Sequence, residues 1–180
     1  DALFEPNLRG MAEKGCALVI GIGFAQKEPL ERVATAFPNT HFAIVDATVN
    51  LPNVASLLFD EHTGPYLVGA IAAASTQTGT IGFVGGMDIP LIRRFEMGYQ
   101  AGAKQVNPKI QVLSNFVGVT SDAWNNPRRG KELATSQYQR GADIIFAPAG
   151  ASNLGVFDAA EEMKHFVIGV DSNQDWIKPG

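Results

Sequence analysis

Short runs of apolar residues alternate along this chain with segments in which apolar residues recur every three or four positions. Residues 17–21 form a continuous apolar run that ends in glycine, which is typical of a buried parallel strand. Residues 29–37 place their apolar side chains on one face of a helix, and Pro38 ends that helix. The pattern predicts further strands at 41–46, 54–59, 80–86, 110–117, 143–147 and 166–170, and further helices at 65–76, 89–106, 126–139 and 152–163.

This alternation of strands and helices predicts an α/β protein with parallel sheets that are covered by helices on both faces. In open sheets of this kind, ligands bind beyond the carboxyl ends of the strands. The residues that follow the predicted strands are small, polar or aromatic, as a small-molecule site requires. They are residues 23–26, 46, 86–88, 120–124, 149–151 and 171–172.

The chain also shows a sign of two lobes. Two predicted strands between residues 41 and 59 follow each other without a helix between them, and the loop 60–64 leads into a new strand–helix series. We therefore expect residues 1–60 to form part of an N-terminal lobe and residues 61–171 to form a second lobe. Residues 172–180 are expected to make a return crossover toward the first lobe.

Composition narrows the range of partners. The chain has 14 Lys and Arg against 18 Asp and Glu, so it lacks the basic face that nucleic acid binding needs. No apolar run reaches the roughly 20 residues that span a bilayer. Cys16 is the single cysteine, so no internal disulfide is possible, and we expect it to be a small buried hydrophobe.

Motifs for catalysis and for cofactors are absent from the sequence. There is no P-loop and no Gly-x-Ser-x-Gly elbow, and the three histidines match no zinc spacing. Residues 21–26 begin like a dinucleotide fingerprint but lack its third glycine. We therefore expect no enzyme activity, no cofactor and no metal. A nucleoside hydrolase or a dehydrogenase, the enzymatic alternatives, would need a metal or a cofactor fingerprint.

One block of the sequence carries a family resemblance. Residues 82–90, Gly-Phe-Val-Gly-Gly-Met-Asp-Ile-Pro, followed by Ile-Arg-Arg-Phe-Glu at 92–96, resemble the signature of the basic membrane lipoprotein family. This family comprises the PnrA-like substrate-binding proteins of ABC transporters. Further matches, which together cover essentially the whole chain, lie at 6–9, 21–24, 66–69, 126–134, 141–146 and 169–174.

The resemblance implies a type I periplasmic-binding-protein fold with two Rossmann-like lobes. It implies a small polar ligand in the cleft between them, most often a purine nucleoside, and delivery of that ligand to an ABC permease. The chain is expected to be periplasmic or lipid-anchored on the outer face of the cell membrane. Against the family pattern, we expect it to lack the first strand and the C-terminal part of the fold, each of which usually contributes ligand contacts.

Four residues are candidates for holding a nucleoside. The position of Trp124 is commonly Phe in the family and packs on the base, and a base–aromatic stack is worth about 1–3 kcal/mol. Asp171 follows a strand, where its carboxylate can accept two ribose hydroxyls. Asp46 occupies the corresponding strand end in the first lobe, with a turn residue as its alternative role. Asp88 either accepts ligand hydroxyls or caps the helix that follows it.

Four smaller or apolar residues complete the predicted site. Ala149 and Gly150 let a ligand approach the backbone after a strand, and Met87 supplies an adaptable apolar wall. Phe24 either lines the cleft or packs in the core. Ser152 stands where a helix N-cap is expected, as does Asn125 or Asn126.

Other interpretations of the sequence stay open. Arg93 and Arg94 are expected on a solvated helix face, with contact to the permease as the alternative. The same fold also serves as a ligand-sensing domain of regulators and receptors. A sugar or an autoinducer-like molecule fits the same cleft logic as a nucleoside.

Overall fold

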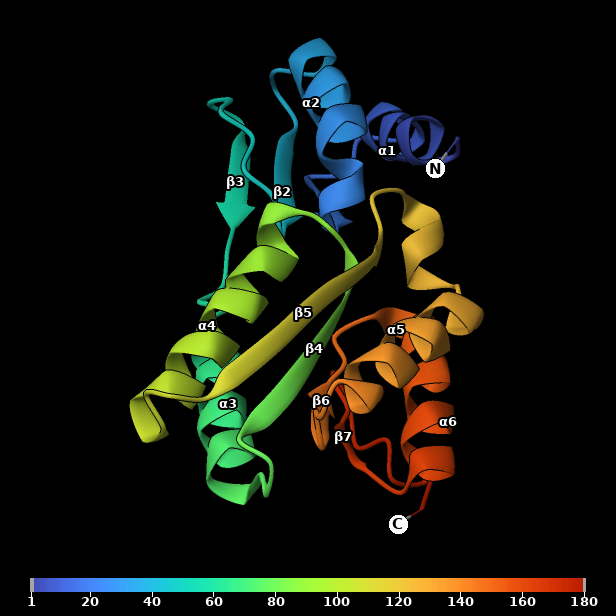
Figure 1. Ribbon diagram of the computed structural model, residues 1–180. Coiled ribbons are helices and arrows are strands. Elements are labelled where there is room, and N and C mark those ends of the chain that lie inside the picture. Colours follow the sequence, from blue (N-terminus) through green and yellow to red (C-terminus); the bar gives the residue numbers. More distant parts are fainter. Residues whose placement is uncertain (1, 180) are drawn as a thin grey trace. The chain divides into compact units, whose positions relative to one another are not determined.

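The computed structural model describes residues 2–179, and the chain divides into two compact units, Asp1–Asp60 and Glu61–Gly180 (Figure 1). Each unit has its own parallel sheet and its own buried core. They are called the first unit and the second unit below.

The first unit contains a three-stranded sheet with the order β1-β2-β3, in which both pairs of neighbouring strands are parallel. Its elements are α1 (Phe4–Glu13), β1 (Leu18–Ile22), the 3-10 turn η1 (Phe24–Gln26), α2 (Lys27–Ala36), β2 (His41–Val45) and β3 (Val54–Leu57). Helix α1 lies where the apolar pattern predicts no element, because only Leu8 and Ala12 in it are buried. Its place is fixed by packing against α2, with Glu5 paired to Arg32 at 2.8 Å.

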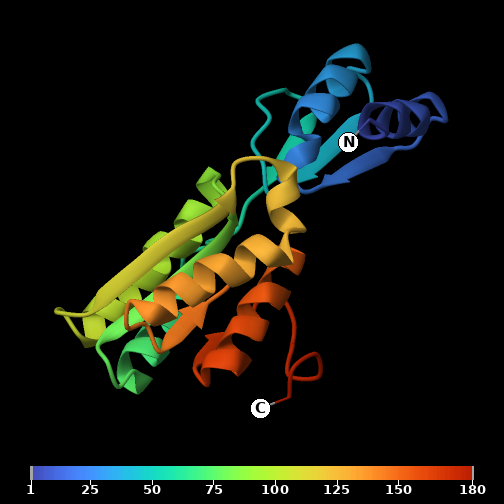
Figure 2. The same ribbon diagram turned by 45° about the vertical axis from the view of Figure 1, so that its right-hand side comes forward.

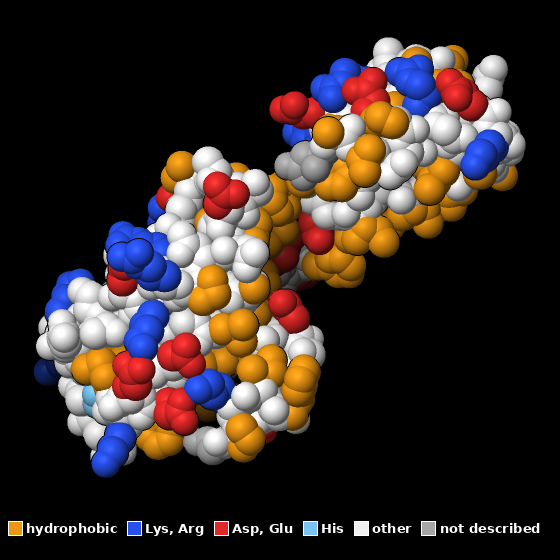
Figure 3. All heavy atoms as spheres, turned by 90° about the vertical axis from the view of Figure 1, so that its right-hand side faces the viewer, with side chains coloured by type: hydrophobic (Ala, Val, Ile, Leu, Met, Phe, Trp, Pro, Cys, Tyr) orange, Lys and Arg blue, Asp and Glu red, His pale blue; other side chains and the backbone are white. Residues whose placement is uncertain are grey.

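Helices cover only one face of this first sheet. The buried core on that face joins Leu8 of α1 and Leu30 of α2 to Val19 of β1. Along β1 the exposure alternates, so Ile20 and Ile22 point away from the helices and are 51% and 71% exposed. The expectation of helices on both faces is therefore wrong for the first unit. Apolar side chains, in orange, reach the surface of this unit in Figure 3.

The second unit contains a four-stranded parallel sheet with the order β5-β4-β6-β7. Its helices are α3 (Thr63–Ser75), α4 (Pro90–Val106), α5 (Pro127–Gln139) and α6 (Asn153–Met163). Its strands are β4 (Thr80–Met87), β5 (Gln111–Gly118), β6 (Ile144–Phe146) and β7 (Phe166–Ile168). Two 3-10 turns, η2 (Ser121–Trp124) and η3 (Gly150–Ser152), follow β5 and β6.

Helices cover both faces of the second sheet, as the sequence predicts (Figures 1 and 2). Helices α3 and α4 pack on one face around Phe83 and Tyr99, and α5 and α6 pack on the other around Val84 and Ile145. Phe83 and Val84 are adjacent on β4, so the central strand contributes to both cores. This arrangement leaves the ends of the strands as the accessible edges of the sheet.

Glycines allow the helices of each pair to approach closely. A side chain on Gly69 of α3 would collide with the carbonyl of Tyr99, and one on Gly102 of α4 would collide with the carbonyl of Tyr66. Backbone therefore packs directly on backbone between α3 and α4, which leaves this pair little freedom to slide.

Two further local predictions have clear outcomes. Asn126 caps α5 by accepting a hydrogen bond from the backbone N–H of Arg129 at 3.0 Å, which confirms the expected cap. Cys16 was expected to be buried but is exposed in the turn between α1 and β1. None of the helices formed by residues 2–179 is long and apolar enough to cross a bilayer.

Candidate functional site

The four strands of the second sheet are parallel, so their carboxyl ends lie along one edge. Strand β4 ends at Met87 and leads to Asp88, and β5 leads through η2 to Trp124. Residues 147–150 follow β6, and Asp171 follows β7. The predicted site residues of the second unit therefore belong to loops at this one edge. Phe24 and Asp46 belong to the first unit.

The indole of Trp124 lies against two glycines. Gly86 is buried on β4, and a Cβ placed on it would lie 2.6 Å from the Cε3 atom of Trp124. A Cβ on Gly150 would lie 3.4 Å from the same atom and 3.1 Å from the Trp124 carbonyl oxygen. Trp124 is half-buried and packs against the core that contains Phe83 and Tyr99. Gly86 thus has to lack a side chain for the ring to lie where it does, whereas Gly150 is restricted by its positive φ of 57° and by the Trp124 carbonyl.

Ser152 holds the backbone on either side of Trp124. Its hydroxyl donates to the Ala123 carbonyl at 2.7 Å and accepts from the Asn126 backbone N–H at 2.7 Å. Ser152 occupies the N-cap position of α6, as the sequence predicts, but its side chain makes no capping bond to that helix. Ser152 is fully buried, and its hydroxyl bonds two residues that lie 26 and 29 positions before it in the sequence.

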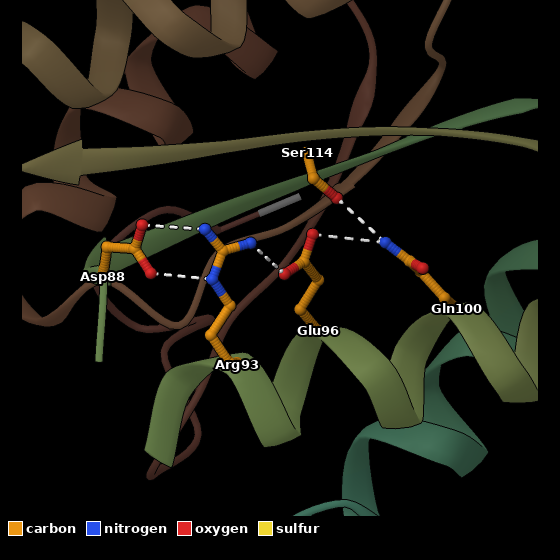
Figure 4. Close-up of polar contacts among 5 residues, drawn as sticks. All are labelled: Asp88, Arg93, Glu96, Gln100 and Ser114. Atoms are coloured by element: carbon orange, nitrogen blue, oxygen red, sulfur yellow. Dashed lines mark hydrogen bonds and ion pairs between the residues drawn. The ribbon is translucent and has the colours of Figure 1, made fainter. Parts of the chain in front are cut away.

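Asp88 is held by an arginine (Figure 4). Arg93 Nε and Nη2 donate to Asp88 Oδ1 and Oδ2, both at 2.7 Å. The N-cap of α4 is Ile89, so the predicted capping role of Asp88 is wrong; its two oxygens accept from the guanidinium instead. These hydrogen bonds hold the pKa of the Asp88 carboxyl below its usual range. Each oxygen keeps a further lone pair that can accept from a hydroxyl.

Arg93 is in turn fixed by other groups. Its Nη1 donates to Glu96 at 2.9 Å, and its Cζ lies 4.2 Å from the centre of the Phe116 ring. Gln100 donates to Glu96 at 3.2 Å and to Ser114 at 3.4 Å, which continues the network along α4 (Figure 4). Arg93 is exposed, as expected for a solvated helix face, but its guanidinium is held in place by these partners.

The neighbouring Arg94 is paired as well. Its Nε donates to Glu61 at 2.7 Å and its Nη2 donates to the same carboxylate at 3.2 Å. Both arginines that were expected to be solvated thus make ion pairs within the second unit.

Asp46 and Asp171 share an unusual backbone conformation. Their φ angles are 66° and 68°, and Lys164 is the one other non-glycine residue with positive φ within residues 2–179. Such residues concentrate at functional sites, and Asp tolerates this conformation better than most residues do. Within the described chain, neither carboxylate takes part in a hydrogen bond or an ion pair with another residue. Both are available to a ligand donor.

A glutamine that the sequence interpretation missed holds the loop of Asp171. Gln174 Oε1 accepts from the Val170 backbone N–H at 2.9 Å and from Asn153 at 3.2 Å. Gln174 belongs to the family match at 169–174, but no spacing rule marks it as a loop support.

The remaining predicted residues differ in access. Met87 is half-buried at the end of β4, whereas Ala149 is fully buried. Phe24 is half-buried and packs against the core of the first unit. A pocket of about 390 Å³ lies between α6, β7 and the segment after β7, and none of the predicted ligand residues lines it. Residues 2–179 contain no cluster of His, Cys, Asp and Glu that could hold a metal ion.

Comparison with known proteins adds independent evidence. The sequence pattern of the Bmp family, described as ABC transporter substrate-binding protein PnrA-like, matches residues 1–180. The CD4+ T-cell-stimulating antigen of Listeria monocytogenes is 37% identical over 97% of this chain and 50% of its own length. The ABC transporter nucleoside-binding protein BmpA of Lactococcus lactis is 36% identical over 97% of this chain and 51% of its own length. The chain thus spans about half the length of these relatives.

Solved structures agree with this result. A solute-binding protein of an ABC transporter system from Aeropyrum pernix superposes with a TM-score of 0.83 at 33% identity, covering 99% of this chain and 52% of that one. Another from Conexibacter woesei gives 0.70 at 29% identity, covering 94% and 56%.

The two parallel α/β units and the residues gathered at the strand ends define a binding protein of the type I periplasmic-binding-protein fold. Within that class, the chain belongs to the PnrA-like family of ABC transporter substrate-binding proteins. The family is described as one of ABC transporter substrate-binding proteins.

Proposed function

We propose that this chain forms part of an extracytoplasmic binding protein that captures a purine nucleoside and delivers it to an ABC permease. The observation that carries the proposal is the indole of Trp124, seated on Gly86 and Gly150 at the carboxyl edge of the second sheet. A purine offers a flat face, and an aromatic side chain binds such a face by stacking. The name of the Lactococcus relative, a nucleoside-binding protein, supports the same ligand class.

Carboxylates at the same edge suit the sugar of a nucleoside. Asp171 is exposed and without a protein partner within residues 2–179, so it can accept two hydroxyls. Asp88 is already charge-compensated by Arg93, so its remaining lone pairs favour neutral donors over a cation. Met87, Ala149 and Gly150 stay predicted neighbours of the ligand, and Phe24 and Asp46 stay predicted contacts from the first unit.

The proposed work is binding and release without chemical change. The permease is the proposed partner, and the proposed location is the periplasm or the outer face of the cell membrane through a lipid anchor. A transport component needs a site that holds its solute and lets it go, and stacking plus hydrogen bonds meet that need.

The direct test is a thermal-shift panel on the purified full-length protein with inosine, guanosine, adenosine, uridine, ribose and glucose. A ligand at 100 times its Kd stabilises the folded state by about 2.7 kcal/mol. Stabilisation by the purine nucleosides is expected. The proposal would be overturned if no nucleoside raised the melting temperature while a sugar did.

A matched pair of variants then tests the role of the indole. Trp124→Ala should weaken nucleoside binding by roughly 5- to 150-fold, the value of a base–aromatic stack. Phe166→Ala is the control, because Phe166 is 69% exposed at the start of β7, at the opposite edge of the sheet. Isothermal titration calorimetry on both variants provides the comparison, and equal losses would contradict the stacking role.

A further inference from the structure

We propose that Ser152 and Gly86 are positioning residues that together fix the indole of Trp124, Ser152 through the main chain and Gly86 through the ring. The inference rests on the proposed function, in which that indole stacks on the base of the ligand. It assigns to these two residues control over how a flat ligand fits the site.

The first support is the hydroxyl of Ser152. Its two hydrogen bonds reach the residue before Trp124 and the second residue after it, Ala123 and Asn126. Both are short, at 2.7 Å, and the side chain is fully buried, so water cannot replace either partner cheaply. The backbone that carries the indole is thereby tied to the turn before α6.

The second support is the missing side chain at Gly86. Gly86 lies on the central strand β4, and its N–H donates to the Pro148 carbonyl at 3.0 Å, so the strand cannot retreat from the ring. A Cβ there would overlap the six-membered ring of Trp124, with Cε3 at 2.6 Å. Real Cβ atoms do not approach a neighbour so closely, so any side chain at this position must displace the indole from where it lies.

These two constraints act on different parts of one residue. The hydroxyl fixes where the main chain of Trp124 passes, and the glycine fixes how near the ring lies to β4. Loss of either one displaces the ring relative to the sheet edge at which Asp88 and Asp171 lie. A base that stacks on the ring would then no longer hold its sugar at these carboxylates.

The first experiment measures the surroundings of the Trp124 indole in the absence of any ligand. The chain has two tryptophans, so Trp176→Phe leaves Trp124 as the sole emitter. In that background, Ser152→Ala should red-shift the emission of Trp124 and increase its quenching by acrylamide. Thr76→Val is the matched control in the same unit, because the Thr76 hydroxyl donates to Asp143 at 2.6 Å near the amino end of β4. It should lower stability and leave the emission unchanged.

The second experiment is a double-mutant cycle read by nucleoside affinity. Gly86→Ala should weaken inosine binding by up to about 150-fold in the natural background. The same substitution should have little effect beside Trp124→Leu, because the ring that it displaces is then absent. The Gly86→Ala variant also tests how the position of the ring controls affinity if Ser152→Ala does not fold.

The outcomes separate the two proposals. Equal changes in Trp124 quenching for Ser152→Ala and Thr76→Val would overturn the role of Ser152. Equal losses of affinity for Gly86→Ala in both backgrounds would overturn the role of Gly86. If the unaltered protein bound no nucleoside, the proposed function would fail. The proposed control of ligand fit by Ser152 and Gly86 would then fail as well. The quenching data would still decide whether Ser152 holds the ring.

Discussion

Asp88 and Asp171 follow strands at the same edge of the second sheet, but their surroundings differ. Asp88 accepts two hydrogen bonds of 2.7 Å from Arg93, and the guanidinium fixes its orientation. Asp171 is exposed and has a left-handed backbone conformation, and Gln174 supports the loop that carries it. The first carboxylate is therefore oriented and charge-compensated, whereas the second has no protein partner within residues 2–179 and is the one that the proposed function assigns to ligand hydroxyls.

Replacing Asp171 by Asn should weaken nucleoside binding by roughly 10- to 150-fold, because hydrogen bonds to a charged group contribute about 1.5–3 kcal/mol. Asn also tolerates the left-handed conformation, so the loop should keep its shape. Asp175→Asn, at an exposed carboxylate of the same segment, should leave the affinity unchanged. Titration calorimetry with inosine measures both, and equal affinities for the two variants would refute the assignment.

Replacing Arg93 by Gln should raise the pKa of Asp88 toward the ordinary value of about 3.9. In the unaltered protein the folded-state pKa is lowered, so the pair stabilises the fold above about pH 3.9 and this contribution is lost as the pH falls through the lower value. In the variant, that acid-side loss should shrink. NMR titration of the side-chain carboxyl measures the pKa. Arg128→Gln, which removes an exposed partner of Glu132, should not move it.

At the scale of elements, α3 and α4 behave as one packed pair. A Cβ on Gly69 would meet the carbonyl group and the next turn of α4, all of it backbone. Backbone cannot rotate away as a side chain can, so the two helices would have to separate. The pair covers the face of the second sheet that Phe83 and Tyr99 fill.

Gly69→Ala should therefore destabilise the protein by about 1–3 kcal/mol, the usual effect of overpacking. Gly64→Ala lies in the same helix, but a Cβ at this position would have no other atom within 4 Å. That substitution should be neutral or stabilising by up to about 1 kcal/mol. Urea unfolding gives both free energies. A Gly69→Ala variant as stable as Gly64→Ala would show that the helices separate at no cost.

The elements themselves were largely predictable from the apolar pattern. Strand β4 stands out as a short, mainly apolar run that ends in glycines, and the long helix α4 stands out because its apolar residues recur every three or four positions. Helix α1 escaped prediction because only Leu8 and Ala12 in it are buried, and these side chains pack on residues distant in the sequence, such as Leu30 of α2. No local pattern records such a contact.

The candidate site shows the same limit. The rule that ligands bind beyond strand ends locates Trp124 and Asp171 correctly at one edge of a parallel sheet. The rule cannot show that Ser152 ties down Ala123, because that hydrogen bond joins positions 29 residues apart. The position of Asp88 just before a helix suggested a capping role. Its pairing with Arg93 could not be predicted, because a five-residue step is not a standard helical pair.

At the scale of the whole molecule, the first unit has an apolar sheet face that no described residue of that unit covers. Leu18, Ile20 and Ile22 of β1 are 53%, 51% and 71% exposed, and Leu57 of β3 is 47% exposed. Parallel sheets are normally buried on both faces. A face of this kind attracts other apolar surfaces.

Replacing Ile20 and Ile22 together by Thr should reduce binding of the dye ANS to the 180-residue chain without lowering its melting temperature. Thr keeps the strand preference of a β-branched residue and exposes less apolar surface. Val19→Thr is the control on the covered face, where Val19 is 1% exposed, and it should lower the melting temperature. Unchanged dye binding in the double variant would show that the dye binds elsewhere.

Under the proposed function, the left-handed backbone at Asp46 and Asp171 restricts how this scaffold could be adapted to a new solute. At an ordinary position, a designer could try every amino acid. At these two, β-branched and bulky residues strain the chain, so Asp, Asn and Gly are the practical choices. Libraries aimed at a different specificity should therefore keep these positions nearly constant and place their diversity at Met87 and Trp124.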